Sequence, residues 1–450
     1  MRSGLPKVLH PLCDQAMIVH VVRVALAVRC EAIVVVVSPH NHAAIEATLL
    51  AAGLGPKVRF AVQAEPRGTG DAARAGMQAV DDSMRQVLVL YGDVPCLRAT
   101  TLEQLLAARA DRPMSVLGAK VADPSGYGRL LRVPGHGADA PLARIVEHKD
   151  CSEAERRIDE INSGIYAIDA AFLRQALPKL SPNNAQNELY LTDVVALAAG
   201  AGQVAVQLLG DADEARGVNS RVDLGEVEIY LRRRLVREHQ VGGVTFVAPE
   251  SVRLAPTVSL GRDVTIGVGV QLLGHTDVQE GAHIDGPSVI KDCRVEAGAH
   301  VHAFSHCERA TIGPAAQVGP YGRLRPGTHL GAGARVGNFV EVKNSTLEAG
   351  AKANHLAYIG DATVAEKANV GAGTITCNYD GFHKHKTHIG RGAFVGSNST
   401  LVAPIDIGDG AITAAGSTLT ENVPNDALAF GRARQSNLPG RAVALREKLA

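Results

Sequence analysis

Aliphatic residues recur at every sixth position through much of the second half of the chain. One run comprises Ile312, Val318, Leu324, Leu330, Val336 and Val342, and a second comprises Ile389, Val395, Leu401 and Ile407. A glycine follows many of them, as at Gly313 and Gly396. A six-residue period is neither helical nor alternating, and it is the signature of a parallel β-helix, whose triangular coils use one hexad per face. A glycine-rich β-sandwich, the alternative, does not hold such a phase.

The hexads run from residue 245 to about residue 420, which predicts about ten coils of about 18 residues each. Ladders of small aliphatic side chains fill the interior of such a coil. The chain fits this demand, because only 4% of its residues are aromatic and it contains no tryptophan.

Strand-like and helix-like segments alternate in residues 1–218. Strands are predicted at 32–38, 58–64 and 86–93, and helices at 40–53 and 70–80. This alternation is typical of a doubly wound α/β sheet. Before the first strand, Leu12 begins an apolar helical pattern that continues through Met17, Ile18, Val21 and Val22, with no strand ahead of it.

A long connecting helix is predicted over residues 219–240, because Leu224, Val227, Leu231 and Leu235 have helical spacing and two glycines follow. The expected domains are therefore an α/β domain at 1–218, a linker helix at 219–243 and a hexapeptide-repeat domain at 244–450.

Composition argues against several classes of partner. The 46 basic residues equal the 46 acidic ones, so no global field recruits nucleic acid or an anionic membrane. The seven cysteines are scattered and include no C-x-x-C pair, which argues against a disulfide framework and suits a reducing cytoplasm. No apolar run is long enough for a membrane helix. Anionic ligands must therefore be bound locally.

Two cations interrupt the hexads where a small residue is usual. Arg325 follows Leu324 and Lys343 follows Val342, 18 residues later, so both should stack on one face. Like charges on adjacent coils repel, and an anion such as phosphate between them would relieve the repulsion. Two solvated surface charges are the alternative.

The next coil carries a candidate base. His355 and Tyr358 lie three residues apart, and residues 371–390 are too long for one hexad, so they must loop out with Asn378, Tyr379 and Lys384. Histidine has the unperturbed pKa that suits proton removal near neutrality. A lone histidine is more often structural, but its neighbours here favour chemistry.

The first half carries two candidate ligand-binding turns. Gly68, Thr69 and Gly70 open a helix after a strand, where backbone N–H groups bind a phosphate or a base edge. Asp93 ends another strand, at the edge where α/β sheets bind ligands and where a carboxylate holds Mg²⁺. The segments GYGRLL, IVEHKD and EINSGIY follow and could form a sugar pocket.

These motifs, in this order, resemble one bacterial family. They are LPKVLH, GTGDA, YGDVP, GYGR, IVEHKD, GVNSR, RLRPG, VGNFVEVK, NHLAYIGDA, NVGAGTITCNYDG and VGSNSTLVAPI. The family is the bifunctional N-acetylglucosamine-1-phosphate uridylyltransferases / glucosamine-1-phosphate acetyltransferases. The resemblance implies a cytoplasmic homotrimer with a left-handed β-helix, acetyltransferase sites shared among subunits, and a product that feeds peptidoglycan and lipopolysaccharide synthesis.

The resemblance implies a uridylyltransferase site that takes UTP and Mg²⁺. Lys7 matches the lysine of the Leu-Pro-Lys motif, which offsets phosphate charge. Asp93 and Asn219 match the Mg²⁺ ligands. Gln63 and the turn at Gly68 and Thr69 match the uracil-reading positions. The other positions line the nucleotide and the N-acetylglucosamine: Tyr91, Gly92, Gly128, Glu147 and Asn162.

The resemblance also implies an acetyltransferase site that takes acetyl-CoA. His355 matches the general base for the amine of glucosamine-1-phosphate. Arg325 and Lys343 match the clamp on the sugar phosphate, and Tyr358 and Asn369 match sugar-site positions. The acetyl-CoA side comprises Ala372, Asn378, Tyr379, Ser397, Ala415 and Arg432, of which Asn378 also counts among the sugar-site positions. Lys384 is a second cation for the cofactor.

Family members begin with a strand and a glycine-rich loop that wraps the UTP phosphates, and this sequence starts directly after that loop. We therefore expect a misassigned or truncating start, with roughly 18 to 20 further codons upstream.

Three other interpretations remain at this point: a chain that is only an acetyltransferase as it stands, a nucleotidyltransferase for another hexose-1-phosphate whose β-helix serves assembly alone, and a regulatory subunit without catalysis. His355 with Arg325 and Lys343 argues against the second, and the presence of Lys7, Asp93 and Asn219 argues against the third.

Overall fold

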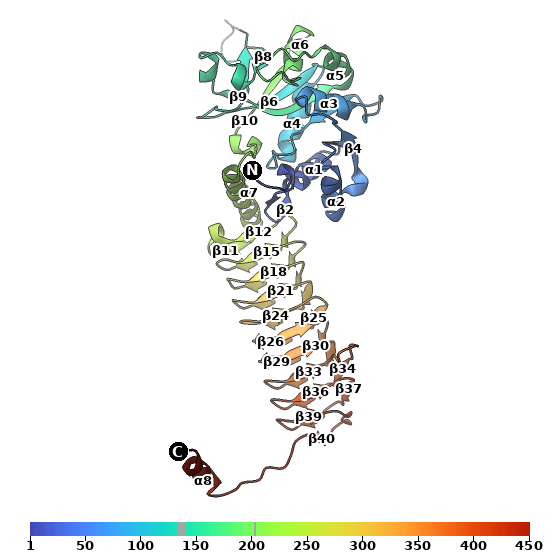
Figure 1. Cartoon of the computed structure of the whole chain (residues 1–450), viewed down its shortest axis with the longest axis vertical. Coiled ribbons are helices and arrows are strands. Elements are labelled where there is room, and N and C mark those ends of the chain that lie inside the picture. Colours follow the sequence, from blue (N-terminus) through green and yellow to red (C-terminus); the bar gives the residue numbers. More distant parts are fainter. Residues whose placement is uncertain (134–139, 202–203) are drawn as a thin grey trace. The chain divides into compact units, whose positions relative to one another are not determined.

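The computed structural model describes residues 1–133, 140–201 and 204–450 of the chain (Figure 1). The chain folds into two compact units, Met1–Leu231 and Arg232–Ala450. Helix α7 (Arg221–Val241) contains the division and occupies the segment in which the sequence predicts a long helix. Within the described residues, no helix is long and apolar enough to cross a membrane.

A six-stranded mixed sheet forms the centre of the first unit. Its order is β10-β6-β9-β7-β8, and β5 also pairs with β9. The strands are β5 (Gln86–Val89), β6 (Met114–Lys120), β7 (Arg129–Arg132), β8 (Leu142–Val146), β9 (Glu160–Asp169) and β10 (Ala205–Leu209). Parallel pairing, expected from the alternation, holds for β6 with β10, but β9 runs antiparallel to β5, β6 and β7. The hairpin of β7 and β8 turns the chain around before β9 enters the sheet.

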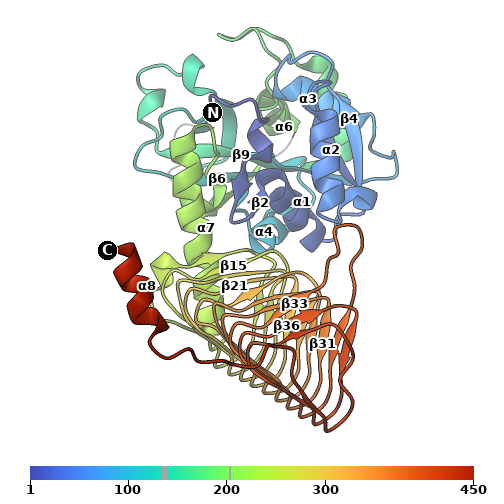
Figure 2. The ribbon, with the colours of Figure 1, turned by 60° about the horizontal axis from the view of Figure 1, so that its bottom comes forward.

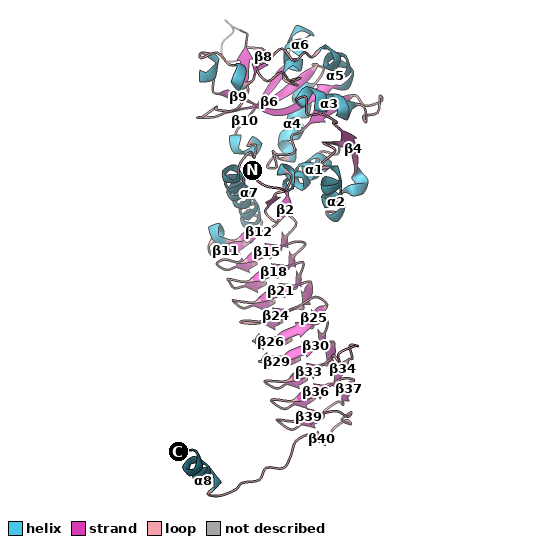
Figure 3. Ribbon diagram, viewed as in Figure 1, coloured by secondary structure: helices cyan, strands magenta, loops and turns pink. Residues whose placement is uncertain are grey.

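Strands β3 (Ile33–Val37) and β4 (Val58–Val62) form a separate parallel pair. Among the described residues, neither strand pairs with the six-stranded sheet. The helices of this unit, shown in Figure 3, are α1 (Met17–Ala27), α2 (His42–Ala51), α3 (Thr69–Met77), α4 (Ala99–Arg109), α5 (Ala170–Ala176) and α6 (Asp193–Ala201). The strands and helices predicted between residues 32 and 93 are all present, with ends shifted by a few residues.

The start of the first helix differs from the prediction. Leu12 lies in a hairpin formed by β1 (Pro11–Leu12) and β2 (Gln15–Ala16), and α1 begins only at Met17. Cys13 and Asp14 turn the chain with positive φ values of 45° and 72°. The expectation of a helix from Leu12 with no strand before it was therefore wrong, although Leu12 is buried like the helical residues.

The second unit is the predicted parallel β-helix. Three parallel sheets of eleven, ten and nine strands form its faces, and each strand pairs with the equivalent strand of the next coil. Figure 2 shows the triangular outline of the stacked coils. All ten hexad aliphatics are buried, with at most 2% of their surface exposed. They form one continuous core, so the six-residue period reflects burial inside the coil.

Glycines after the aliphatics allow coils to stack closely. A Cβ on Gly337 would lie 2.0 Å from the Asn354 carbonyl oxygen of the next coil, and one on Gly396 would lie 2.5 Å from the Ala415 backbone nitrogen. A side chain there would collide with backbone, so the corner requires glycine. Arg325 and Lys343 therefore stand at corners that differ from these.

One coil is interrupted by an extruded loop. Strand β31 (Ala362–Val364) pairs Ala362 directly with Thr387 of β34 (Thr387–Ile389), so the intervening chain adds a loop to the coil after β33 (Ile375–Cys377). An isolated bridge between Tyr379 and Lys384 closes this loop. The sequence predicted the extrusion from the length of the segment.

Candidate active sites

Lys7 connects the two predicted metal ligands of the first unit. Its Nζ donates to Asp93 Oδ2 at 2.5 Å and to Asn219 Oδ1 at 3.0 Å. The 3-10 turn Lys7–Leu9 supplies the lysine, and the segment after β5 supplies the aspartate. The Asp93 carbonyl also accepts a hydrogen bond from Val218 N at 2.9 Å. This bond holds the segment that precedes Asn219 against the segment that contains Asp93. Residues far apart in sequence thus place three polar side chains at one point.

The glycine-rich turn is built as the start of helix α3. Gly68 has a φ of 104°, and a Cβ there would lie 2.6 Å from the Leu189 carbonyl oxygen, so only glycine fits. Gln63 Nε2 donates to the Gly68 carbonyl at 3.2 Å and to Asp71 Oδ2 at 3.0 Å. The next residue, Thr69, accepts at Oγ1 from Leu191 N at 3.0 Å. The predicted uracil-reading positions are therefore adjacent.

Tyr91 lies against Gly164, close to Glu147 and Thr69. A Cβ on Gly164, whose φ is 80°, would lie 2.5 Å from a Tyr91 ring carbon, so this glycine makes room for the ring. Burial raises the pKa of Tyr91, and the nearby Glu147 carboxylate adds to the effect. The Tyr91 phenol is thus a neutral hydrogen-bonding group. The next residue, Gly92, lies against Val8 and Ile18, and a Cβ there would come within 3.3 Å of both.

Gly128 precedes β7, Glu147 follows β8, and Asn162 lies within β9, and the three residues meet at one place. A Cβ on Gly128 would be 3.4 Å from a Glu147 carboxylate oxygen and 3.5 Å from Asn162 Cβ. Asn162 is buried and donates from Nδ2 to Tyr166 Oη at 2.7 Å. Thr192 donates to Glu147 Oε1 at 3.2 Å, and burial raises the pKa of Glu147. These contacts form a polar pocket wall of the kind that binds hydroxyl groups.

The two hexad-breaking cations stack as predicted. Leu324 of β24 (Arg323–Leu324) pairs with Val342 of β27 (Glu341–Lys343), and Arg325 N donates to the Val342 carbonyl at 2.9 Å. However, Arg325 Nη1 also donates to Glu341 Oε1 at 2.7 Å. The chain's own carboxylate therefore balances Arg325, and the two cations alone do not demand an external anion.

Lys343 has a second cation beside it. The neighbouring Lys343 lowers the pKa of Lys384 in the extruded loop, as expected for two close ammonium groups. Asp361 lies near both, and although partial burial opposes the effect, hydrogen bonds from Asn344 and Asn378 lower its pKa. Asn378 Nδ2 donates to Asp361 Oδ2 at 2.5 Å. The loop thus adds positive charge to the face that carries Arg325.

His355 ends strand β29 (Lys352–His355) and is exposed. Its Nδ1 lies 2.7 Å from Oδ1 of Asn338, the residue paired with it on the preceding coil. An amide oxygen only accepts, so Nδ1 carries the proton and Nε2 keeps a free lone pair. The imidazole is therefore held in the tautomer that a general base requires.

A column of small residues continues along the coils from His355. Ala372, Ser397 and Ala415 follow it at the same corner of successive coils, because Asn398 N donates to the Ala372 carbonyl at 2.7 Å and Gly416 N donates to the Ser397 carbonyl at 2.8 Å. The Arg432 side chain lies beside Gly416, 3.7 Å from where a Cβ on that glycine would stand. These four predicted acetyl-CoA positions therefore form one continuous strip.

The remaining predicted positions flank this strip. Asn369 pairs with Lys352 in the same sheet, and Tyr358 of β30 (Tyr358–Gly360) pairs with Glu341. The Tyr358 hydroxyl lies over Gly360, 2.5 Å from where a Cβ would stand. Tyr379 projects from the extruded loop with 60% of its surface exposed. The structure thus gathers the predicted acetyltransferase residues around two adjoining faces of the β-helix.

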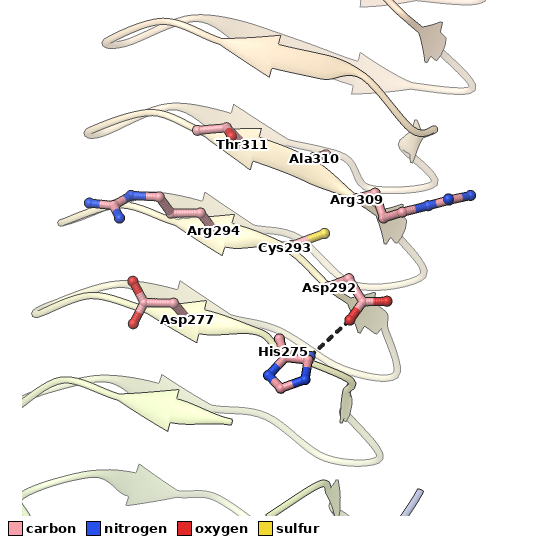
Figure 4. Close-up of a pocket in the computed structure, with 8 residues that line it drawn as sticks. All are labelled: His275, Asp277, Asp292, Cys293, Arg294, Arg309, Ala310 and Thr311. Carbon is pink, nitrogen blue, oxygen red and sulfur yellow. Dashed lines mark hydrogen bonds between the residues drawn. The ribbon is translucent and has the colours of Figure 1, made fainter. Parts of the chain in front are cut away.

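A separate surface pocket lies on the nine-stranded sheet (Figure 4). It has a volume of about 350 Å³ and is lined by His275, Asp277, Asp292, Cys293, Arg294, Arg309, Ala310 and Thr311. His275 N donates to Asp292 Oδ1 at 2.8 Å across it. Its lining includes none of the residues predicted from sequence, so it belongs to neither candidate site.

Sequence reasoning missed three partners in these sites: Asn338, which holds His355; Glu341, which neutralises Arg325; and Asp361, which fixes Asn378. Asn338 and Glu341 both lie in the segment VGNFVEVK, so the signal was present as polar residues at outward hexad positions. Their roles depend on which residues stack, and that requires the length of each coil.

Two family models match the chain: "MobA-like NTP transferase domain" over residues 1–164 and "Bacterial transferase hexapeptide (six repeats)" over residues 386–421. "Bifunctional protein GlmU" of Sorangium cellulosum is 46% identical over all of this chain and 94% of its own length. The proteins of that name from Stutzerimonas stutzeri and Streptomyces avermitilis are 46% and 44% identical over 98% of this chain, and over 95% and 91% of theirs. The chain therefore belongs to the GlmU family of bifunctional enzymes, which unite an acetyltransferase with a uridylyltransferase.

Proposed function

We propose that the β-helix N-acetylates glucosamine-1-phosphate with acetyl-CoA, and that the α/β unit then transfers uridylyl from UTP to the product. The observation that carries the proposal is His355, held by Asn338 with Nε2 free, beside a face that bears Arg325, Lys343 and Lys384. The test measures coenzyme A release from acetyl-CoA and pyrophosphate release from UTP on the same preparation.

In the acetyl transfer, His355 Nε2 removes a proton from the 2-amine as its nitrogen attacks the thioester carbon. The C–N bond forms, the C–S bond breaks, and the proton held on His355 Nε2 passes to the departing sulfur, so that coenzyme A leaves as a thiol. Asn338 keeps Nδ1 protonated throughout, so that Nε2 remains the basic atom. Arg325 and Lys343 bind the sugar phosphate, and Tyr358 and Asn369 orient the ring. The strip from Ala372 to Arg432, with Asn378 and Tyr379, binds acetyl-CoA.

In the uridylyl transfer, a phosphate oxygen of N-acetylglucosamine-1-phosphate attacks the α-phosphorus of UTP, and pyrophosphate leaves as its P–O bond breaks. Lys7 offsets the phosphate charge. Gln63 and the turn at Gly68 and Thr69 bind uracil, while the remaining side chains position the sugar: Tyr91, Glu147 and Asn162, with Gly92 and Gly128 giving close backbone approach. The protein acts chiefly by positioning and neutralising.

The first site also has the donors that Mg²⁺ requires. A carboxylate oxygen of Asp93 and an amide oxygen of Asn219 both face the Lys7 ammonium, so two hard oxygen ligands converge on one cation position. These residues fit the ion. When bound there, Mg²⁺ would neutralise charge on the phosphate groups.

The proposal includes a homotrimer in the cytoplasm and the domain limits 1–218, 219–243 and 244–450. An exposed apolar ladder next to His355 supports self-association. It consists of Phe304, Tyr321, Phe339 and Leu356, each at a left-handed corner, and the first three rings stack at 4.9 and 5.1 Å. Between 46% and 62% of each side chain is exposed. Such a contiguous apolar surface marks a protein interface.

We expect Arg325→Ala to raise the Michaelis constant for glucosamine-1-phosphate at least about tenfold, because it removes a charge-assisted contact to the phosphate. The constant for acetyl-CoA should change little, and unphosphorylated glucosamine should be acetylated equally by variant and parent. Steady-state kinetics with each substrate checks this. A variant that fails mainly on acetyl-CoA would assign Arg325 to the cofactor instead.

We expect Tyr321→Asp to weaken trimer formation by on the order of tenfold or more, because it buries a charge in the ladder. Sedimentation equilibrium across a dilution series measures this. Leu50→Asp is the control, since Leu50 is 63% exposed on α2 of the other unit and should leave assembly unchanged. A Tyr321→Asp chain that remains trimeric at every concentration would exclude the ladder from the interface.

A further inference from the structure

Four side chains with metal-binding atoms meet on the outer face of the eleven-stranded sheet, outside both proposed active sites. Two of them, His283 and His300, begin the strands β17 (His283–Ile284) and β20 (His300–Val301) of adjacent coils. The other two, Asp285 and His302, directly follow these strands. His283 pairs with His300. Ile284 follows His283 and is fully buried, so Asp285 is the next outward-facing residue of its coil. Val301 is likewise buried between His300 and His302.

The distances within this cluster are short. His283 Nε2 lies 2.9 Å from Asp285 Oδ1, and His300 Nε2 lies 2.8 Å from Asp285 Oδ2. The ligand atoms of these three residues all lie within 4.8 Å of one another. His302 Nδ1 is 3.5 Å from Asp285 Oδ2, and its ring lies against that of His300, with the ring centroids 3.9 Å apart and the planes tilted by 37°. Two imidazole nitrogens and a carboxylate thus surround one point, with a third imidazole alongside.

The neighbouring coils leave this point accessible. Asp285 and His302 stand between Gly267 on the coil before and Gly319 on the coil after, neither of which has a side chain. A Cβ on Gly267 would lie 2.7 Å from the Gly286 backbone nitrogen, so no larger residue fits there. Between 32% and 46% of each of the four polar side chains is exposed. An ion from solvent can therefore reach the carboxylate and the imidazoles.

We propose that His283, Asp285 and His300, with His302 beside them, bind one divalent ion of the zinc class. Imidazole nitrogens and one carboxylate oxygen suit Zn²⁺, which they hold at about 2.0 to 2.2 Å, whereas Mg²⁺ and Ca²⁺ prefer oxygen ligands. Since its ligands come from two coils, the ion crosslinks β17 to β20. The site is a structural clamp on the β-helix, and it is separate from the Mg²⁺ position at Asp93.

Equilibrium dialysis of the 450-residue chain against Zn²⁺, after removal of metal with a chelator, tests the proposal. We expect the parent to bind zinc at this cluster, and His300→Ala to weaken that binding more than tenfold. His302→Ala should weaken it by about tenfold, as expected for a residue that orients a ligand. Zinc should raise the unfolding temperature of the parent and not that of His300→Ala, because binding to the native state alone stabilises it.

His385→Ala is the matched control. His385 also lies 2.8 Å from a carboxylate, that of Asp380, but it belongs to the extruded loop and not to the cluster. Its removal should leave the zinc-dependent rise in unfolding temperature intact. All the changed side chains face outward, and equal unfolding temperatures without zinc would show that the variants fold. Equal zinc affinity and equal stabilisation in the parent and His300→Ala would overturn the proposal, as would a parent that binds no zinc.

Discussion

Replacing His355 by alanine should lower acetyl transfer by at least about 100-fold, the size of effect expected when a general base is removed. The side chain is exposed and is hydrogen-bonded to Asn338, itself a surface residue of the preceding coil, so its loss should leave the fold intact. Coenzyme A release from acetyl-CoA with glucosamine-1-phosphate measures the loss.

Two controls accompany this variant. His329→Ala removes another exposed, outward-facing histidine of the β-helix, paired in register with Thr346, and should keep full activity. Pyrophosphate release from UTP should be unchanged in both variants, because the uridylyltransferase residues belong to the other compact unit. If His355→Ala lost both activities alike, the two sites would not be independent.

The mirror experiment changes the first unit. Asp93→Asn preserves the shape of the side chain but removes the charge that faces Lys7 at 2.5 Å, and it weakens the oxygen set offered to Mg²⁺. We expect uridylyl transfer to fall at least about 100-fold, comparable to the loss of a preorganised electrostatic group. Acetyl transfer should remain. Pyrophosphate release at saturating UTP and Mg²⁺ measures the effect.

Asp82→Ala serves as the matched control, because this aspartate is 97% exposed and its ion-pair partner, at 3.2 Å, is Arg174, which belongs to neither site. Full uridylyl transfer by Asp93→Asn would show that Lys7 and Asn219 suffice without the carboxylate, and the proposed metal position would then be wrong.

The β-helix could be predicted because its signal is local. Buried aliphatic residues such as Val318 and Leu401 recur at a fixed distance along the chain. The repeat can therefore be recognised in the sequence without knowing which strands pair. The stacking of Arg325 on Lys343 followed in the same way, since that coil has the standard length. The hairpin at Leu12 was missed because strands of two residues carry no periodicity.

Contacts across coils were less accessible from sequence. Asn338 and His355 pair at a separation of 17 residues, whereas Leu324 and Val342 pair at 18. A difference of one residue changes which side chains become neighbours, and the hexads do not reveal where it occurs. The antiparallel entry of β9 was hidden for a related reason, because strand direction depends on the whole path between strands.

The register of the parallel coils also limits where residues can be inserted into or deleted from the β-helix. Each strand is bonded to its equivalent one coil away, so inserting or deleting a few residues inside a face would put aliphatics such as Ile284 outside the core. Changes that preserve the stack fall between strands, as where a separation of 18 residues becomes 17 or where a loop bulges outward between β33 and β34, or they add or remove a whole coil. Along the axis, the His283 cluster and His355 can therefore move apart or together only in steps of one coil, about 4.8 Å each.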